Sequence, residues 1–279
     1  MKYLIVLFCL YYFMPLTSQG QGTKGGQAVY LFTHVRDTTN RTQVYEEILL
    51  LQFTSNASLY RNYSKYYDDS LFNDNMAKAK AGLPVQVSSE PIRVKKSTIE
   101  QLMYQFDADK SYFIHPWVGE TLVIENPIEK IQWTLGDSSI VIGGLSCYKA
   151  SGNFKGRTYD VWYCPDYPVK AGPWKLNGLP GLIVEATDRT RTVSFKLSAI
   201  YSNNMARLEL PALHKKITKA KFNSLIEDLK QNPNGYINAA MNGLAAPGAG
   251  TNTSISVNTN PSATARVKNK VNNPLELAE

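Results

Sequence analysis

The sequence predicts a mainly β fold of the α+β class, in which an antiparallel sheet carries one or two packed helices. Three observations support this prediction. Short runs of strand-forming residues follow one another from residue 28 to residue 201, with little helical patterning between them. Residues 147–164 read as a hairpin, and residues 190–201 alternate apolar and polar side chains. Many successive short strands of this kind favour antiparallel pairing.

The expected strands can be placed in order along the chain. Residues 28–34 and 44–55 flank a polar turn, and Leu59-Tyr60 continues the pattern. Residues 63–83 are rich in Tyr, Ser, Lys, Asp and Asn, which predicts a long loop with one short helix near residues 75–81. The remaining strands before the hairpin are expected at residues 84–94, 101–107, 111–118, 121–125, 130–135 and 139–147.

A helix is predicted after Thr218. Threonine is a favoured N-cap residue, and a polar Asn-Pro-Asn-Gly run ends the helix. The expected apolar stripe at helical spacing consists of Phe222, Leu225, Ile226 and Leu229. We expect the stripe to pack on the sheet, and the alternative is a face offered to a partner.

The hairpin of residues 147–164 has a self-consistent register. When Cys147 faces Cys164, Lys149 faces Trp162, and residues 154–157 remain as a short loop with a glycine available for a positive φ. Directly opposed residues in an antiparallel pair lie about 4.5–5.5 Å apart at Cα, within the range of a disulfide. We therefore expect a structural disulfide between the two cysteines, and the alternative is two free, buried thiols.

The next segment, residues 171–186, predicts a turn that leads into a buried strand. Leu179-Pro180-Gly181-Leu182 fits a type II turn, in which Gly181 takes a positive φ. We interpret the turn as a structural corner where backbone approaches backbone closely, and the alternative is a recognition loop. The signature turn consists of Gly172, Pro173, Gly178, Leu179, Pro180, Gly181, Leu182 and Ile183.

These residues carry a resemblance to a known family. Residues 172–183, Gly-Pro-Trp-Lys-Leu-Asn-Gly-Leu-Pro-Gly-Leu-Ile, resemble the signature of the GLPGLI family of exported Bacteroidota proteins. Further matches are residues 131–133, 147–150, 154–159, 162–163 and 273–277. The family is mostly uncharacterised and offers no catalytic residues to carry over. Its module is similar to a bowl-shaped domain that precedes the catalytic part of one type of bacterial peptide N-glycosidase, which implies a strongly curved sheet, a bowl or half-barrel.

The N-terminus predicts a secretory signal peptide. Lys2, an apolar run over residues 3–16 and the small or polar residues 17–20 form its three regions. The apolar run is too short to argue for a membrane span. Cleavage after about residue 20 would leave one domain, residues 21–279, with a flexible stretch near residues 245–265 and no transmembrane span. We expect a periplasmic, outer-membrane-associated or secreted protein, in which two cysteines meet an oxidising compartment.

The charge pattern excludes one class of partner. The net charge is +7, and the charges are dispersed rather than gathered in a run with interleaved aromatics. Such a pattern is unlike the basic surfaces that track a phosphate backbone, so we expect no nucleic-acid partner. A weak attraction to anionic lipid or polysaccharide stays open.

No catalytic or metal-binding constellation stands out. His34, His115 and His214 form no metal-ligand spacing, and Ser146 lacks the second glycine of a nucleophile elbow. We interpret the acidic pairs as loop residues rather than as an acid and a base: Asp68 with Asp69, Asp107 with Asp109, and Asp160 with Asp166. We therefore expect no metal, no cofactor and a binding protein rather than an enzyme.

A cluster of aromatic residues is the candidate binding face. It consists of Trp133, Tyr159, Trp162, Tyr163 and Trp174. Alternate residues of a strand share a face, so Trp162 lies with Cys164, and Tyr159 lies with Tyr163 on the other side. One set would line a concave site for sugars or an apolar ligand, and the alternative is core packing around the cysteines.

The function hypothesis is therefore an exported, non-catalytic binding or accessory module that meets a glycan, an apolar ligand or an envelope protein. A hydrolase or glycan-processing accessory is the first alternative. A structural part of an outer-membrane assembly is the second.

Overall fold

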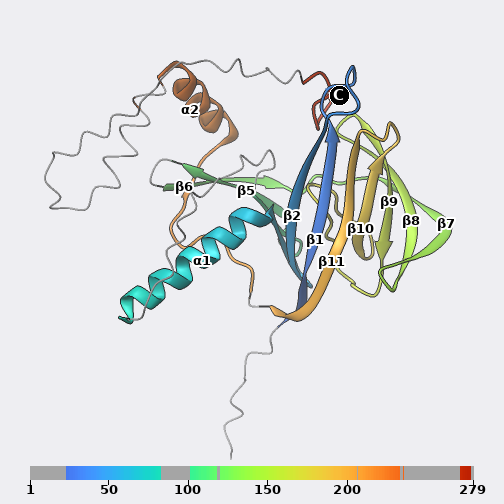
Figure 1. Cartoon of the computed structure of the whole chain (residues 1–279), viewed down its shortest axis with the longest axis horizontal. Helices are drawn as coiled ribbons and strands as arrows, with labels where there is room; N and C mark the ends of the chain where they lie inside the picture. Colours follow the sequence, from blue (N-terminus) through green and yellow to red (C-terminus); the bar gives the residue numbers. More distant parts are fainter. Residues whose placement is uncertain are drawn as a thin grey trace, which may run out of the picture.

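The computed structural model describes residues 23–82, 101–117, 120–205, 207–232, 235 and 271–277. These residues contain one large sheet and two helices (Figure 1). The helices are α1 (Tyr63–Lys80) and α2 (Lys219–Gln231). The strands are β1 (Thr23–Val35), β2 (Val44–Thr54), β3 (Ala57–Asn62), β4 (Gln101–Gln105), β5 (Lys110–Trp117), β6 (Glu120–Pro127), β7 (Trp133–Ile142), β8 (Leu145–Phe154), β9 (Arg157–Cys164), β10 (Leu182–Asp188), β11 (Val193–Met205) and β12 (Lys215–Lys216).

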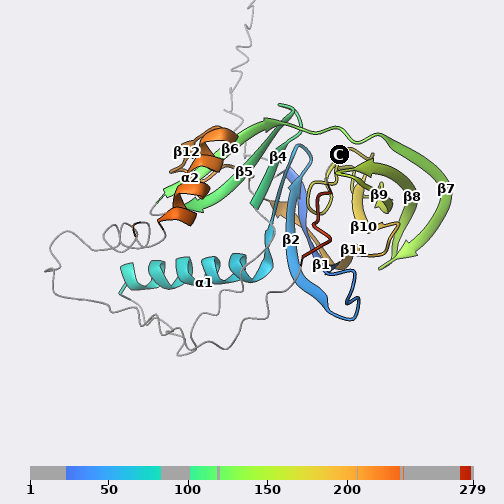
Figure 2. The same cartoon turned by 90° about the horizontal axis from the view of Figure 1, so that it is seen from above.

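The twelve strands follow the order β12-β6-β5-β4-β3-β2-β1-β11-β10-β9-β8-β7. Every neighbouring pair is antiparallel except β12 and β6, which are parallel, so the sheet is mixed. Figure 2 shows β7 to β11 on one side of β1 and β2, with β4 to β6 and both helices on the other. The mainly β prediction is confirmed. The sheet is open, with β7 and β12 at its edges, and the bowl or half-barrel stays a prediction.

The middle of the sheet is apolar on both faces. In β2, Leu49, Leu50 and Leu51 are all fully buried, as expected for a strand covered on both sides. On β1 and β11, Phe32 stacks on Phe195 at 4.8 Å between ring centroids. These rings belong to the main core, which also takes in residues of β8, β9, β10 and the segment 165–181. The long connection after β9 therefore packs on the sheet.

Helix α2 confirms the helix expected after Thr218. The Thr218 hydroxyl accepts a hydrogen bond from the Lys221 N–H at 3.1 Å, as an N-cap does. Phe222 is buried against Leu122 and Ile124 of β6, so the apolar stripe packs on the sheet. The alternative, a face offered to a partner, does not fit the buried Phe222.

Helix α1 corrects the long loop expected at residues 63–83. Helical structure begins at Tyr63, where the Asn62 side chain accepts a hydrogen bond from the Lys65 N–H at 2.7 Å. The segment contains neither glycine nor proline, and an Asp74–Lys78 ion pair at 2.6 Å spans one turn. The sequence did not predict the full length of this helix because its residues are mostly polar. No apolar stripe at helical spacing marks a face that would be buried.

One expected strand is divided. The structure places a hairpin turn at Gly143 and Gly144, both with positive φ, inside the predicted strand of residues 139–147. Residues 139–142 belong to β7, and residues 145–147 begin β8. Three predictions lie outside the described residues: the signal peptide, the strand at residues 84–94 and the flexible stretch at residues 245–265.

Candidate functional site

The predicted hairpin register is confirmed. Strands β8 and β9 pair Lys149 with Trp162, Ser151 with Asp160 and Asn153 with Thr158. The turn is tighter than expected, because Phe154 already pairs with Arg157. Only Lys155 and Gly156 remain between them, with φ values of 50° and 71°. Positive φ at both central residues is typical of a type I′ turn.

The expected disulfide is not formed in the structure. Cys147 and Cys164 are free thiols, and both side chains are buried. Burial raises the pKa of Cys147 to about 11, with a smaller contribution from the charge of Cys164. Burial likewise raises the pKa of Cys164. As free thiols both cysteines are protonated at neutral pH, and the disulfide stays a prediction.

The type II turn predicted at residues 179–182 is wrong. Among the glycines with positive φ in the described residues, the signature turn contributes Gly178 at 96° and not Gly181. A Cβ atom at Gly181 would instead lie 2.4 Å from the carbonyl oxygen of Cys164 and 2.6 Å from its carbonyl carbon. Gly181 is therefore needed for close backbone approach, which is the structural corner that the sequence also suggested.

The other signature residues are mostly buried. A Cβ at Gly172 would lie 2.7 Å from the Leu176 carbonyl oxygen. Leu179, Leu182 and Ile183 are all in the main core. Pro173 accepts a backbone hydrogen bond from Leu176 at 3.1 Å, whereas Gly178 and Pro180 are exposed. The signature turn is thus a buried corner of the fold, apart from Gly178 and Pro180.

The predicted aromatic face is mostly core as well. Tyr159, Tyr163 and Trp174 are buried, and Trp162 is half-buried. Half-buried Trp133 donates its indole N–H to the Asn177 carbonyl at 2.8 Å. The five residues do not form one exposed surface, which agrees with the alternative of core packing. Of the five, only Trp174 lines the cavity described next.

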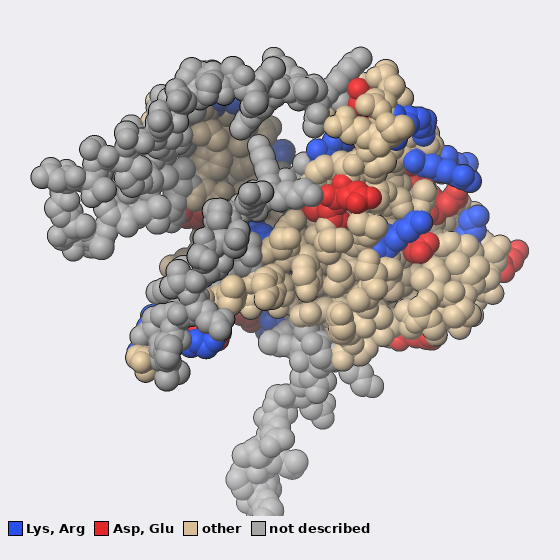
Figure 3. Space-filling model, in the orientation of Figure 1, with Lys and Arg blue, Asp and Glu red and all other residues tan. Residues whose placement is uncertain are grey.

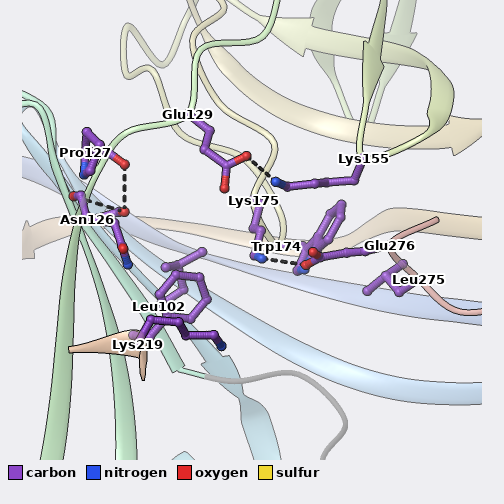
Figure 4. Close-up of a pocket in the computed structure, with 12 residues that line it drawn as sticks. Leu102, Asn126, Pro127, Glu129, Lys155, Trp174, Lys175, Lys219, Leu275 and Glu276 are labelled. Atoms are coloured by element: carbon purple, nitrogen blue, oxygen red, sulfur yellow. Dashed lines mark hydrogen bonds and ion pairs between the residues drawn. The ribbon is translucent and has the colours of Figure 1, made fainter. Parts of the chain in front are cut away.

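A cavity of about 600 Å³ lies where the segment 165–181, the C-terminal segment and strands β5 and β6 meet. Figure 4 shows the residues around it. Trp174 and half-buried Phe113 supply aromatic surface, and Ser111 and Asn126 supply polar groups. The lining consists of Leu102, Ser111, Phe113, Asn126, Pro127, Glu129, Lys155, Trp174, Lys175, Lys219, Leu275 and Glu276.

Two ion pairs cross this lining (Figure 4). Lys155 contacts Glu129, and Lys175 contacts Glu276. The Lys175 ammonium also lies 4.9 Å from the ring centroid of Phe113 and 5.7 Å from that of Trp174. Such short distances favour cation–π attraction. The cavity therefore presents aromatic rings beside charges that are largely compensated.

Arg157 connects the hairpin to the C-terminal segment. Its Nη1 donates to the Asp188 carboxylate at 2.8 Å and to the Thr192 hydroxyl at 3.0 Å. Nη2 donates to the Asn273 side chain at 2.6 Å and to the Pro274 carbonyl at 2.5 Å. Nε donates to the Leu275 carbonyl at 3.0 Å. All five N–H donors of this buried guanidinium are satisfied.

Asn273 is held from its other side by β1. Its side-chain amide donates to the Val35 carbonyl at 2.7 Å, and its carbonyl lies 2.8 Å from His34 Nε2. Because a carbonyl only accepts hydrogen bonds, Nε2 carries the proton. Burial lowers the pKa of His34 to about 4, with smaller contributions from Arg157 and Arg36. His34 is therefore a neutral, structural histidine at pH 7.

Asp188 completes this buried network. Burial alone would raise the pKa of the Asp188 carboxyl, but hydrogen bonds from Thr190, Val193 and Thr192 outweigh it and lower the pKa. The N–H groups of Thr192 and Val193 donate at 2.7 and 2.8 Å. The carboxylate is therefore ionised opposite the Arg157 guanidinium, which stabilises the charged pair.

The remaining candidate residues do not converge. His115 stacks on Phe222 at 4.2 Å between ring centroids, and exposed His214 lies 2.7 Å from the Pro211 carbonyl. The described residues hold no group of three His, Cys, Asp or Glu that could bind a metal ion. Of the acidic residues that formed the sequence pairs, Asp107, Asp109, Asp160 and Asp166 do not line the cavity. The side chains of Asp68 and Asp69 lie outside the described part of the structure.

Sequence reasoning missed the cavity and the role of Arg157. The role of Arg157 could have been inferred from the sequence, because residues 154–159 and 273–277 both matched family motifs, and Arg157 joins these two segments. The cavity itself left no signal. Its lining comes from segments as far apart in sequence as Leu102 and Glu276, and each residue is ordinary in its local context.

The fold and cavity define a class, a protein whose described residues form a large open β-sheet with two helices and a partly charged cavity that opens to solvent. A family model described as "Protein of unknown function (Porph_ging)" matches residues 153–185, which contain β9 and all of the signature turn. The comparison with curated proteins finds no significant match. The name GLPGLI stays a resemblance.

The solved structures that are similar to this chain include two of PNGF-II. A structure of PNGF-II in space group C2 has a TM-score of 0.51, with 12% identity, over 74% of this chain and 33% of that chain. A second structure of PNGF-II, in space group P21, has a TM-score of 0.50 and 14% identity, with the same coverage. The chain therefore spans about a third of the length of PNGF-II, and the likeness concerns the fold.

No helix among the described residues is both long enough and apolar enough to cross a bilayer.

Proposed function

We propose that this chain is an exported, non-catalytic binding module of the cell envelope or the secreted fraction, and that its ligand occupies the cavity in Figure 4. The observation that carries the proposal is the cavity itself. It has a volume of about 600 Å³ and combines aromatic rings with polar groups that converge from separate segments. Cavities of this size and composition are typical of small-ligand sites.

The lining favours a polar ligand with an apolar face, of which a glycan is the best example. Phe113 and the edge of Trp174 offer ring surface on which a sugar can pack. Asn126, Glu129 and Lys155 offer donors and acceptors for hydroxyl groups. A purely apolar ligand would exclude water from these polar groups and offer them no hydrogen bonds in return, which costs free energy.

The second candidate function is an accessory part of a glycan-processing hydrolase. Its support is the fold shared with PNGF-II, of whose chain this fold accounts for a third. In this alternative the same cavity would hold a glycan while a separate protein performs the chemistry. Both candidate functions thus assign a glycan ligand to the same cavity.

A titration of the purified chain against a glycan panel tests the proposal. The variant is Phe113→Ala, and the matched control is Tyr148→Ala, which removes an exposed aromatic ring of β8 outside the cavity. We expect at least one glycan to bind, with affinity lost in Phe113→Ala and kept in the control. Equal binding by both folded variants would place the ligand elsewhere.

A further inference from the structure

One wall of the cavity is made by a segment that belongs to no strand or helix. Leu275 and Glu276 line the cavity from residues 271–277, which are irregular throughout. The segment is attached by hydrogen bonds to Arg157 and by the Leu277 N–H, which donates to the Lys155 carbonyl at 3.1 Å. The position of this wall therefore depends on contacts with Arg157 and Lys155, which are far from it in the sequence.

We infer that Glu276 is a specificity-determining residue that excludes anionic ligands from the cavity, and that Arg157 is the residue that positions it. The inference rests on the proposed function of the cavity as a ligand site. It goes further, because it names the charge of the ligand that the site accepts, an uncharged glycan.

The charges on the cavity wall are largely paired. Three lysines and two glutamates line the cavity, and Glu129 and Glu276 each contact one lysine. The Lys175 side chain is only 14% exposed and that of Glu276 is 43% exposed, so water screens their attraction only in part. A carboxylate, sulfate or phosphate beside Lys175 would have to replace the Glu276 carboxylate or lie close to it. Repulsion between like charges disfavours both arrangements.

Removal of the Glu276 charge would leave lysine charges in the cavity without a carboxylate partner. Lys175 would keep its charge with no other carboxylate contact among the described residues, and Lys219 lines the same cavity without an ion pair there. Two uncompensated ammonium groups beside one cavity favour an anion. Glu276 is thus the group whose charge decides between neutral and anionic ligands.

Arg157 positions Glu276 through the two residues before it. The guanidinium holds the carbonyl groups of Pro274 and Leu275 at 2.5 and 3.0 Å, directly before Glu276 in the chain. A lysine at this position keeps the charge beside Asp188 but lacks the planar fork that serves five acceptors at once. Arg157→Lys is therefore expected to release the segment while it leaves a cation opposite Asp188.

The test measures the binding of inorganic phosphate, by calorimetry at low ionic strength, to four folded full-length proteins. These are the parent chain, Glu276→Gln, Arg157→Lys and the control Glu227→Gln, which removes an exposed carboxylate of α2 outside the cavity. We expect Glu276→Gln to bind phosphate about tenfold more tightly than the parent. Arg157→Lys should shift in the same direction, and the control should match the parent.

A second readout does not depend on any ligand. Reaction of Lys175 with an amine-directed reagent, read by peptide mass spectrometry against exposed Lys130, should increase in Arg157→Lys. If Arg157→Lys fails to fold, full-length Asn273→Ala replaces it, because this variant removes one acceptor of the Arg157 guanidinium and keeps Arg157, Asp188 and Glu276. Unchanged Lys175 reactivity in the released variant would overturn the positioning role.

Failure of the inference and failure of the proposed function give different results. Unchanged phosphate affinity in Glu276→Gln overturns the inference, whether or not a glycan binds. Absence of glycan binding by the parent chain, with phosphate binding gained in Glu276→Gln, supports the charge selection and counts against the glycan ligand.

Discussion

Gly181 and Cys164 approach each other so closely that no side chain fits between them. A Cβ on Gly181 would lie 2.4 Å from the Cys164 carbonyl oxygen, in contact with backbone that has no free rotation to move away. We expect Gly181→Ala to lower the free energy of unfolding by about 1–3 kcal/mol, measured by urea denaturation. The matched control is Gly136→Ala, because a Cβ there meets only ordinary contacts at 3.5 Å and beyond. Equal stability of the two variants would contradict the assignment.

Removal of the Arg157 guanidinium should be among the most destabilising single changes. Arg157→Leu leaves Asp188 charged and buried without its cation, so we expect a loss of about 3–5 kcal/mol in the free energy of unfolding. Arg189→Leu is the control, since Arg189 is exposed and lies 3.8 Å from Asp160. Its loss should stay below about 1 kcal/mol. Similar losses in both variants, measured by urea denaturation, would refute the buried network.

Acid should weaken the fold through His34. The pKa of His34 in the folded protein is about 4, below its ordinary value of 6.5, so between these values the unfolded chain binds a proton that the folded chain does not. The stability that neutral His34 contributes is complete above pH 6.5 and decreases as the pH falls toward 4. We expect the parent chain to lose more stability between pH 7 and pH 4.5 than His34→Gln. Parallel pH profiles would show that His34 is not the responsible group.

The two thiols give a redox prediction. Strands β8 and β9 place Cys147 and Cys164 next to the paired residues Tyr148 and Tyr163, so the cysteines are neighbours across the hairpin. We propose that the predicted disulfide forms when the chain is exported into an oxidising compartment. Intact mass before and after reduction and alkylation should show both cysteines protected together. Two alkylated thiols in freshly exported, unreduced protein would argue against the bond.

Sequence patterns were reliable where local chemistry decides the structure. The β8–β9 register followed from pairing arithmetic, and the start of α2 followed from the capping chemistry of Thr218. The type II turn at Gly181 failed for a different reason. The Pro-Gly pair has two physical explanations, a positive φ or a close backbone approach, and only the packing of residues 164–165 chooses between them.

The candidate site was less accessible from sequence. Trp174 was predicted to bind a ligand with four other aromatics, yet most of these aromatics pack in the core and its cavity neighbours are Lys175, Phe113 and Glu276. Contacts between residues 113, 175 and 276 depend on the order of strands in the sheet, and strand order leaves no periodic trace in the chain. Only the last part of helix α1 was predicted, near residues 75–81, since the helix has no apolar stripe.

The position of β1 has a consequence for how the chain is made. This first strand pairs with β2 beside it in sequence and also with β11, where Thr23 lies opposite Met205. The centre of the sheet is therefore incomplete until nearly three quarters of the polypeptide has been synthesised, and pairing across so long a loop is slow. A nascent chain with this topology has its central strand unpaired on one side during synthesis, so β1 exposes backbone hydrogen-bonding groups until β11 has been made.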